Sequence, residues 1–242
     1  GLQVACRLRP RVILLENVPQ LLEHKGGDTW RACRALLELS GYTVQVEEVD
    51  AAHFVPQRRA RFFVVATTSD VTVDFAGAAA AVARRPKVTL RSAFPSWSGC
   101  YYLRHRRSWG RSLHSLDGQS PPLRTNCAQR ARTYKTVRAD APFDFATANQ
   151  PSLQELRTIM GWPQWTRLPS SRAAAGRVLG NSVCPPVTRW LGHLVISELE
   201  SADLRAGLAS ALGQVRDGRE LRSVQRALRD VPLPAAELSV RR

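Results

Sequence analysis

The chain has 242 residues, of which 44% are hydrophobic, so it is long and apolar enough to bury a core and is not a disordered chain. No apolar run approaches the roughly 20 residues of a membrane span, and the polar, mixed start GLQVACRLRP does not resemble a signal peptide. The formal net charge of +15 favours nucleic acid as a partner.

The cysteines indicate an intracellular, reducing compartment, which would be the cytoplasm and nucleoid or a nucleus. They lie singly, without a CxxC pair or a His/Cys cluster, so we expect neither a metal site nor a disulfide framework. Cys184, in SVCPPV, is interpreted as a small buried hydrophobic residue. The five are Cys6, Cys33, Cys100, Cys127 and Cys184.

The first part of the chain predicts alternating strands and helices. RVILLE (residues 11–16) is apolar without alternation, which is typical of a strand covered on both faces in a parallel sheet. Residues 26–42 predict a helix that Asp28 caps, and YTVQVEEV (42–49) and RFFVVATT (61–68) predict two further strands. Strand, helix and strand in this order indicate an α/β fold.

A basic segment follows the third strand. Residues 84–138 hold thirteen Lys and Arg but one acid, Asp117, and aromatic residues are interleaved with the cations. This composition favours contact with phosphates and stacking on bases. GC-rich codons would explain why Arg outnumbers Lys 32 to 3, but not the near absence of acids. We therefore predict a smaller, loop-rich lobe that binds nucleic acid.

Helical patterns return after the basic segment. SLQE predicts a capping box between Ser152 and Glu155, and Gly161 would end that helix. Pro186 would begin a helix with a wide apolar face. The tail at 201–242 repeats leucines at helical spacing, which we interpret as a solvated amphipathic helical pair, with a partner-docking face as the alternative.

Four short stretches together suggest a family. They are ENV (16–18), QRRAR (57–61), LQELRTIMGWP (153–163) and GNSVCPPV (180–187). In this order, with a variable basic segment between the second and third, they resemble the later motifs of the DNA (cytosine-5) methyltransferases. The resemblance covers about residues 10–199. It implies an α/β fold with a partial Rossmann-like sheet of an S-adenosylmethionine-dependent methyltransferase, plus a small basic, loop-rich target-recognition lobe.

The resemblance also divides the chain into four parts. Residues 1–72 would be the second half of the catalytic α/β domain, and residues 73–150 the target-recognition, DNA-binding region. Residues 151–200 would return to the catalytic domain with a helix that supports the lobe and the last cofactor motif. Residues 201–242 would form a helical tail.

The resemblance implies that Glu16, Arg59 and Arg61 are catalytic. The family flips cytosine out of the duplex, adds a cysteine thiolate to C6 and transfers a methyl group to C5. Glu16 would engage N3 of the ring and relieve the charge that builds there. Arg61 would contact the carbonyl oxygen of the base, and Arg59 would lie near the nucleophile loop and the phosphate. In an extended chain, both arginines and Gln57 face the same way.

Cofactor and DNA contacts are implied in the same way. GNSVCPPV would complete the S-adenosylmethionine pocket, with Gly180 in a tight turn and contacts from Asn181, Ser182 and Val183. Double-stranded DNA would be the substrate. The residues predicted to contact it are Asn17, Gln57, Arg124, Arg130 and Arg132.

The family's early motifs are absent from the sequence, which holds no Gly-rich loop after a first strand and no Pro-Cys dipeptide to supply the nucleophile. We therefore expect a C-terminal part of the enzyme, either a fragment or one subunit of a split enzyme, that is inactive without its missing N-terminal half or a complementary subunit. Half a sheet would leave an unpaired edge and low solubility. The alternatives are a catalytically inactive, methyltransferase-like DNA-binding or regulatory protein and an unrelated basic RNA-binding protein.

Overall fold

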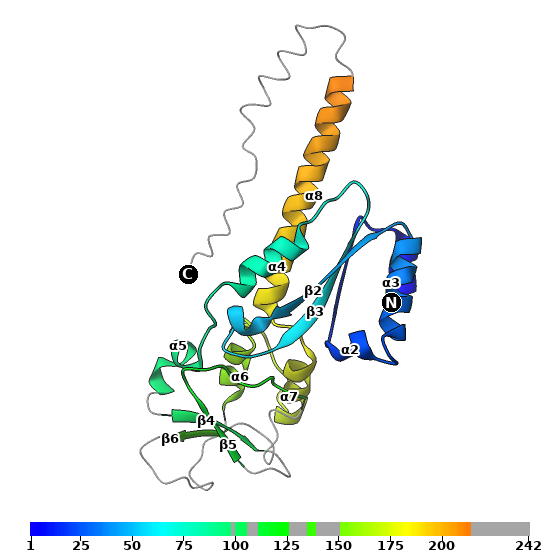
Figure 1. Ribbon diagram of the computed structural model, residues 1–242. Coiled ribbons are helices and arrows are strands. Elements are labelled where there is room, and N and C mark those ends of the chain that lie inside the picture. The colour runs from blue at the N-terminus through cyan, green and yellow to red at the C-terminus, as the bar shows by residue number, and fades with distance from the viewer. Residues whose placement is uncertain (98–99, 106–110, 126–134, 139–150, 214–242) are drawn as a thin grey trace.

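Two β-sheets and their flanking helices make up the described part of the chain, residues 1–97, 100–105, 111–125, 135–138 and 151–213 of the computed structural model (Figure 1). The strands are β1 (Val12–Asn17), β2 (Thr43–Asp50), β3 (Ala60–Thr67), β4 (Cys100–His105), β5 (Arg111–Ser115) and β6 (Lys135–Arg138). The α-helices are α1 (Leu2–Leu8), α2 (Gln20–Glu23), α3 (Asp28–Leu39), α4 (Phe75–Ala83), α5 (Leu90–Ala93), α6 (Leu153–Ile159), α7 (Arg172–Asn181) and α8 (Pro185–Gly213). Two 3-10 turns are η1 (Ala51–His53) and η2 (Pro95–Trp97).

Strand β3 lies in the centre of the first sheet, which has the order β1-β3-β2, and runs antiparallel to both neighbours. The prediction that neighbouring strands are parallel was therefore wrong. β1 and β2 do run in the same direction, with α3 between them in the chain, but β3 is inserted between them in the sheet. Residues 51–59 connect β2 to β3 through η1 alone, and a parallel neighbour needs a longer crossover.

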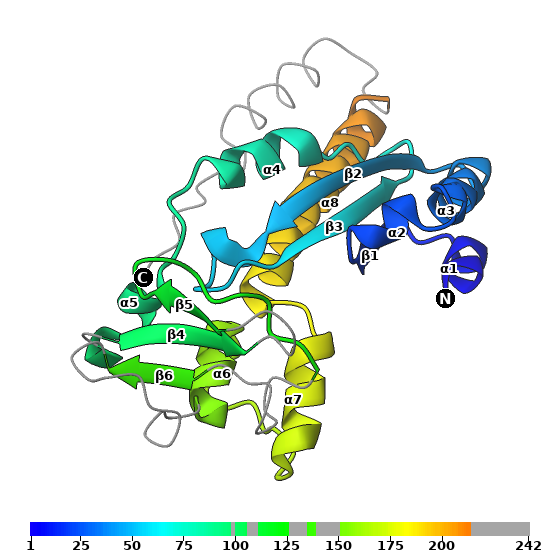
Figure 2. The ribbon, with the colours of Figure 1, turned by 60° about the horizontal axis from the view of Figure 1, so that its bottom comes forward.

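Helices cover both faces of this sheet, as the predicted α/β fold requires (Figure 2). On one face, Phe62 and Val64 of β3 pack with Leu37 of α3. On the opposite face, Phe63 of β3 packs in the core that includes Trp190 of α8 and residues of α4. β3 is buried along most of its length because it has a strand on each side and helices on both faces.

Strand β1 is an edge strand within the part of the chain that the structure describes. It was predicted to be covered on both faces, but Ile13 is its one fully buried residue and Leu14 is 43% exposed. Leu14 pairs with Val65 and lies on the face that α4 and α8 cover over β2 and β3. The cover on that face therefore reaches Val12 of β1, which packs against the main core, but leaves Leu14 open.

Five α-helices of the described residues were not predicted from the sequence, namely α1, α2, α4, α5 and α7. The segment of α4 is nearly all alanine, so it has little contrast between an apolar and a polar face. α4 packs against β2, and its Phe75 and Val82 belong to the sheet's main core. The predicted target-recognition region, which begins at residue 73, therefore starts with a helix that packs on the first sheet.

The predicted helix ends are partly confirmed. α6 has its capping box, since the Ser152 hydroxyl accepts from the Glu155 backbone N–H and the Glu155 carboxylate accepts from the Ser152 N–H. For α3 the prediction was wrong, because Gly27 is the N-cap and Asp28 instead pairs with Arg31 at 2.5 Å. With φ at +89°, Gly27 takes the backbone position that Asp28 was expected to hold.

The second sheet, in the order β5-β4-β6, is antiparallel and lies at the end of the molecule far from α1 and α3 (Figure 1). Trp97, just before β4, stacks on Phe94 with ring centroids 4.2 Å apart. The indole N–H of Trp97 donates to a carboxylate oxygen of Glu155 at 3.0 Å. Helix α6 is thus attached to the segment that leads into this sheet, in agreement with its predicted supporting position.

Helix α8 begins at Pro185, one residue earlier than predicted, and continues to Gly213. The predicted boundary between residues 200 and 201 therefore falls inside one continuous helix. The end of α8 projects beyond the first sheet (Figure 1). Residues 214–242, which hold the rest of the predicted helical tail, lie outside the described residues.

Among the residues that the structure describes, no helix combines the length and apolar character needed to cross a membrane. The same residues contain no group of three or more His, Cys, Asp or Glu side chains that could hold a metal ion. Cys6, Cys33 and Cys184 are free thiols.

Candidate active site

Glu16 and Arg61 meet at the edge of the first sheet. Glu16 pairs with Phe63 in the β1–β3 register, and Arg61 precedes Phe63 by two residues, so all three side chains lie on one face. The Nε atom of Arg61 lies 3.0 Å from Oε1 of Glu16, with side-chain exposures of 17% and 29%. The resemblance implied that these two groups converge on one base, and the structure brings them together in a partly open position.

Arg59 is buried, with 3% of its surface exposed. Its Nη1 donates to the carbonyl oxygen of Leu123 at 3.0 Å, and its Nη2 donates to those of Gly180 and Ser182 at 2.8 and 2.7 Å. In this arrangement the guanidinium group faces backbone carbonyls of two distant segments. The predicted contact with a nucleophile loop or a phosphate would require this group to leave those carbonyls.

Gln57 was predicted to contact DNA, and in this structure it is 0% exposed, so that contact would require the segments around it to move. Its Oε1 accepts from the N–H of Leu123 at 2.6 Å, and its Nε2 donates to the carbonyl of Ile159 and to the sulfur of Met160. Alternation correctly predicted that Gln57 points inward with Arg59. It could not show that α6 and residue 123 cover that side.

The Gly180–Val183 segment joins α7 to α8 next to these arginines. Gly180 was predicted to allow a tight turn, but it lies in α7 and is required for space, since a Cβ there would come within 2.3 Å of the backbone of Arg124 and Thr125. Asn181 is exposed, Val183 is half-buried, and the Ser182 hydroxyl donates to the carbonyl of Leu179. An exposed amide beside an apolar side chain suits the mixed polar and apolar surface of S-adenosylmethionine.

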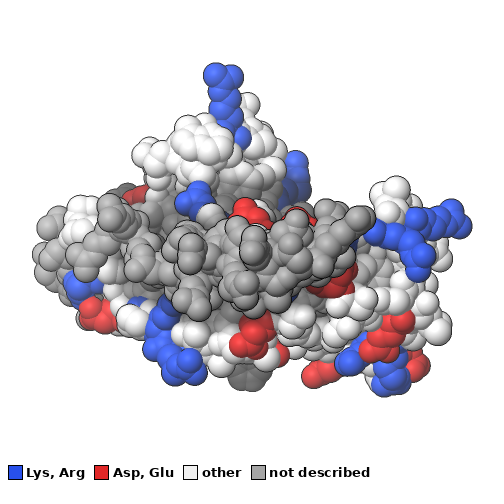
Figure 3. Space-filling model, turned by 90° about the horizontal axis from the view of Figure 1, so that it is seen from above, with Lys and Arg blue, Asp and Glu red and all other residues white. Residues whose placement is uncertain are grey.

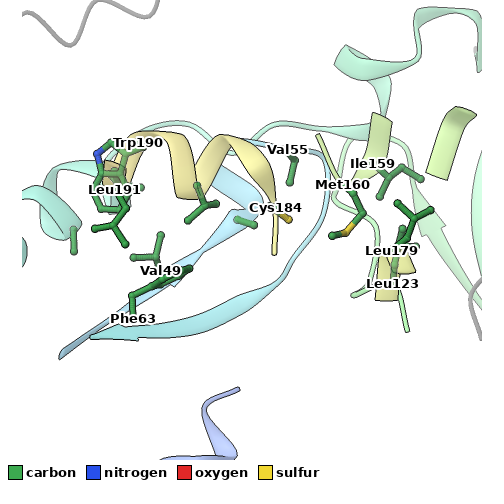
Figure 4. Close-up of a cluster of buried hydrophobic side chains, with 14 of the residues drawn as sticks. Val49, Val55, Phe63, Leu123, Ile159, Met160, Leu179, Cys184, Trp190 and Leu191 are labelled. Atoms are coloured by element: carbon green, nitrogen blue, oxygen red, sulfur yellow. The ribbon is translucent and has the colours of Figure 1, made fainter. Parts of the chain in front are cut away.

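Cys184 directly follows the Gly180–Val183 segment. Its thiol lies in the main core at the start of α8 (Figure 4). Burial raises the pKa of the Cys184 thiol to about 11, although the charges of Arg59 and Arg61 act in the opposite direction, while Glu16 raises it further. A thiol in this environment stays protonated at neutral pH, which agrees with its interpretation as a buried hydrophobic residue and not a nucleophile.

The predicted DNA contacts are only partly described. Asn17 and Arg124 are exposed, whereas Arg130 and Arg132 lie outside the described residues. In the view of Figure 3, the described Lys and Arg side chains are scattered among acidic ones. Most of the basic segment lies in parts whose side chains the structure does not describe, so the predicted basic surface stays a prediction.

Asp50 is a site residue that the sequence analysis missed. Its Oδ1 accepts from the backbone N–H groups of Ala52 and Arg59 at 3.1 and 2.8 Å, and its Oδ2 lies 3.9 Å from Nζ of Lys87. It therefore holds the turn that delivers Arg59 and Arg61 to the site. An acid directly after a predicted strand was the available signal.

Solved methyltransferase structures share this fold. A putative DNA modification methyltransferase encoded within a prophage of E. coli aligns with a TM-score of 0.60 over 82% of this chain and 72% of its own, at 14% identity. The Dnmt2 methyltransferase of S. pombe aligns with a TM-score of 0.54 over 78% and 66%, at 18% identity. The class that the fold defines is thus a methyltransferase-type α/β protein.

Within that class, residues 2–96 match the sequence profile of the C-5 cytosine-specific DNA methylases. The Type II methyltransferases M.MspI of Moraxella and M.BsuFI of Bacillus subtilis are each 28% identical, over 79% and 84% of this chain. The predicted resemblance to the cytosine-5 methyltransferases is thereby confirmed. The chain spans about half the length of these relatives, 47% and 52%.

Proposed function

We propose that this chain is the part of a DNA cytosine-5 methyltransferase that grips the flipped target cytosine. The observation that carries the proposal is the contact between Glu16 and Arg61, a carboxyl group and a guanidinium group 3.0 Å apart on one partly open sheet face. The relatives named as Type II methyltransferases support DNA as the substrate. Such chemistry on a base requires it to leave the helical stack.

Glu16 and Arg61 have different roles at the base. Glu16 engages N3, and its carboxyl group lowers the cost of the negative charge that develops on the ring when C6 is attacked. Arg61 already uses Nε for Glu16 and Nη1 for the carbonyl of Ala60, so Nη2 is the nitrogen that we assign to the base oxygen. The ion pair also holds Arg61 in place before the base arrives, which reduces the ordering that binding requires.

The cofactor proposal rests on the segment between α7 and α8. Asn181, Ser182 and Val183 would hold part of S-adenosylmethionine, which supplies the methyl group. Arg59, two residues before Arg61, donates to the carbonyls of Gly180 and Ser182, so the proposed cofactor residues lie near the proposed base site. Arg124, Arg130, Arg132 and the exposed Asn17 would contact the DNA.

We further propose that a second protein segment completes the enzyme within the cell, either the N-terminal half of a longer chain or a complementary subunit. It would supply the nucleophilic cysteine and the Gly-rich cofactor loop. Two observations support this proposal: the chain spans about half the length of M.MspI and M.BsuFI, and the outer edge of β1 faces no strand among the described residues. Without that segment, we expect no methyl transfer.

The decisive experiment compares Glu16→Gln with wild type in the longer protein or complex that carries this chain. We expect the methylation rate to fall by about 100-fold or more, with DNA affinity changed less than about threefold, because general acid assistance contributes about 10²–10⁴-fold. Glu48→Gln, an exposed carboxylate on β2, is the matched control and should leave the rate unchanged.

The same experiment separates the alternative function. A catalytically inactive DNA-binding or regulatory protein has no use for an acid directed at cytosine N3, so Glu16→Gln would leave the partner's methylation rate unchanged. Robust methyl transfer by the present chain alone would instead contradict the proposal that its nucleophile comes from another segment.

A further inference from the structure

Two side chains of the QRRAR motif hydrogen-bond the backbone N–H and the backbone carbonyl of Leu123. Its N–H donates to Oε1 of Gln57 at 2.6 Å, and its carbonyl accepts from Nη1 of Arg59 at 3.0 Å. The backbone of Gln57 also forms a parallel bridge with Ser120. The segment after β5 of the second sheet is therefore hydrogen-bonded to the residues just before β3.

The same two side chains reach further segments. Nη2 of Arg59 donates to the carbonyls of Gly180 and Ser182, on either side of Asn181, and Nε2 of Gln57 donates to the carbonyl of Ile159 at the end of α6. Gly180 allows α7 to pack closely against the segment after β5, because a Cβ there would lie 2.3 Å from the backbone carbonyl carbon of Arg124. One buried cluster thus joins the lobe, α6 and the proposed cofactor segment.

Arginine suits this position for a physical reason. Burying a charge is costly unless it is hydrogen-bonded, and the planar guanidinium group can serve the Leu123, Gly180 and Ser182 carbonyls in fixed directions at once. A lysine ammonium is a single point charge on a flexible stem and cannot span the same three oxygens with this geometry. At 3% exposure, Arg59 is built into the protein interior and not into a surface that meets DNA.

We propose that Gln57 and Arg59 are positioning residues that couple DNA binding on the lobe to S-adenosylmethionine binding at Asn181–Val183, with the backbone of Leu123 as the shared element. The proposal rests on the function proposed above. DNA that orders the segment after β5 also orders the Leu123 carbonyl, and through Arg59 it orders the Gly180 and Ser182 carbonyls. Each ligand then lowers the ordering cost of the other, and by linkage the effect is reciprocal.

The test measures the dissociation constant of S-adenosylhomocysteine with and without a saturating duplex of randomised sequence, in the longer protein or complex that carries this chain. In the wild type we expect DNA to tighten cofactor binding by about fivefold or more, the lower range of measured couplings. In Arg59→Lys this ratio should fall towards one. Arg58→Lys, an exposed neighbour with the same chemical change, should retain the wild-type ratio.

A second variant guards against a folding defect. Gln57→Met keeps the side-chain volume but removes the acceptor for the Leu123 N–H, so it should lower the same ratio and speed amide exchange at Leu123. If the wild type binds both ligands but DNA does not change the dissociation constant of S-adenosylhomocysteine, the coupling is wrong and the proposed function is not affected. The same holds if both variants keep the wild-type ratio of dissociation constants. A wild type that binds neither ligand overturns the proposed function and the coupling together.

Discussion

At the scale of single residues, burial assigns the three arginines of QRRAR to three different environments. Arg58 is exposed, Arg59 is enclosed by backbone carbonyls, and Arg61 lies at a partly open edge beside Glu16. The alternation of the extended chain correctly separates Arg58 from the other two. Of the two that face the same way, Arg61 is the one that lies beside Glu16 and stays partly open.

Cys184 predicts a loss of stability at high pH. Burial raises the pKa of this thiol from its ordinary value of 9.0 to about 11. The unfolded chain therefore releases this proton first, and the folded state is favoured fully below about pH 9. As the pH rises from about 9 to about 11, unfolding becomes easier by about 1.4 kcal/mol for each pH unit.

Urea unfolding between about pH 8 and pH 11 measures this slope. Cys184→Ala is expected to lower stability at all pH values but to flatten the decline above pH 9. Some decline should persist in the variant, because burial also raises the pKa of Tyr42, whose hydroxyl donates to the carbonyl of Pro10. An equally steep decline in both proteins would show that the thiol does not cause it.

At the scale of elements, the first sheet shows what a strand pattern can and cannot predict. The three strands of the sheet and helix α3 were predicted close to their observed positions, because their apolar runs are long and bounded by turn residues. The insertion of β3 between β1 and β2 was not predicted. A buried apolar run shows that both faces of a strand are covered, but not the direction of its neighbours.

Helix α7 offers a matched pair of glycine substitutions. Gly180→Ala places a methyl group against the Arg124–Thr125 backbone, so we expect a loss of about 1–3 kcal/mol in the free energy of unfolding. Gly192→Ala, in α8, meets nothing within 4 Å and should gain about 0.5–1 kcal/mol from helix propensity. Urea unfolding of both variants checks this, and changes of equal sign would contradict the packing role of Gly180.

At the scale of the whole molecule, exposed apolar side chains lie on and beside the edge strand of the first sheet. Among the described residues, Leu14 of β1 and Val18 just after β1 are both exposed. Together with the open edge of β1, they form a surface that the proposed second segment would cover. Leu14 lies on the same sheet face as the main core, whose buried side chains come from β2, β3, α4 and α8.

This surface predicts association of the isolated chain. We expect sedimentation velocity to show assemblies that grow with protein concentration, because apolar side chains beside an unpaired strand favour self-contact. Leu14→Lys should reduce the assembly, whereas Leu39→Lys, at the end of α3 where Leu39 is 88% exposed, should not. A monomer at all concentrations for the unmodified chain would contradict the prediction.

The sequence by itself determined which residues form the three strands of the first sheet, the capping box of α6, and the presence of an acid and an arginine at the ends of neighbouring strands, whereas the strands of the second sheet were not predicted. These features depend on residues close together in the chain, whose spacing is visible in the sequence. Only the tertiary structure decided that β3 runs antiparallel between β1 and β2, that Gln57 and Arg59 are enclosed, and that Gly180 is needed for space. Each of these features depends on a partner far away in the chain, which is Leu123 or Arg124 in most cases. A local sequence pattern gives the direction in which a side chain points, but it does not give the segment that the side chain meets there.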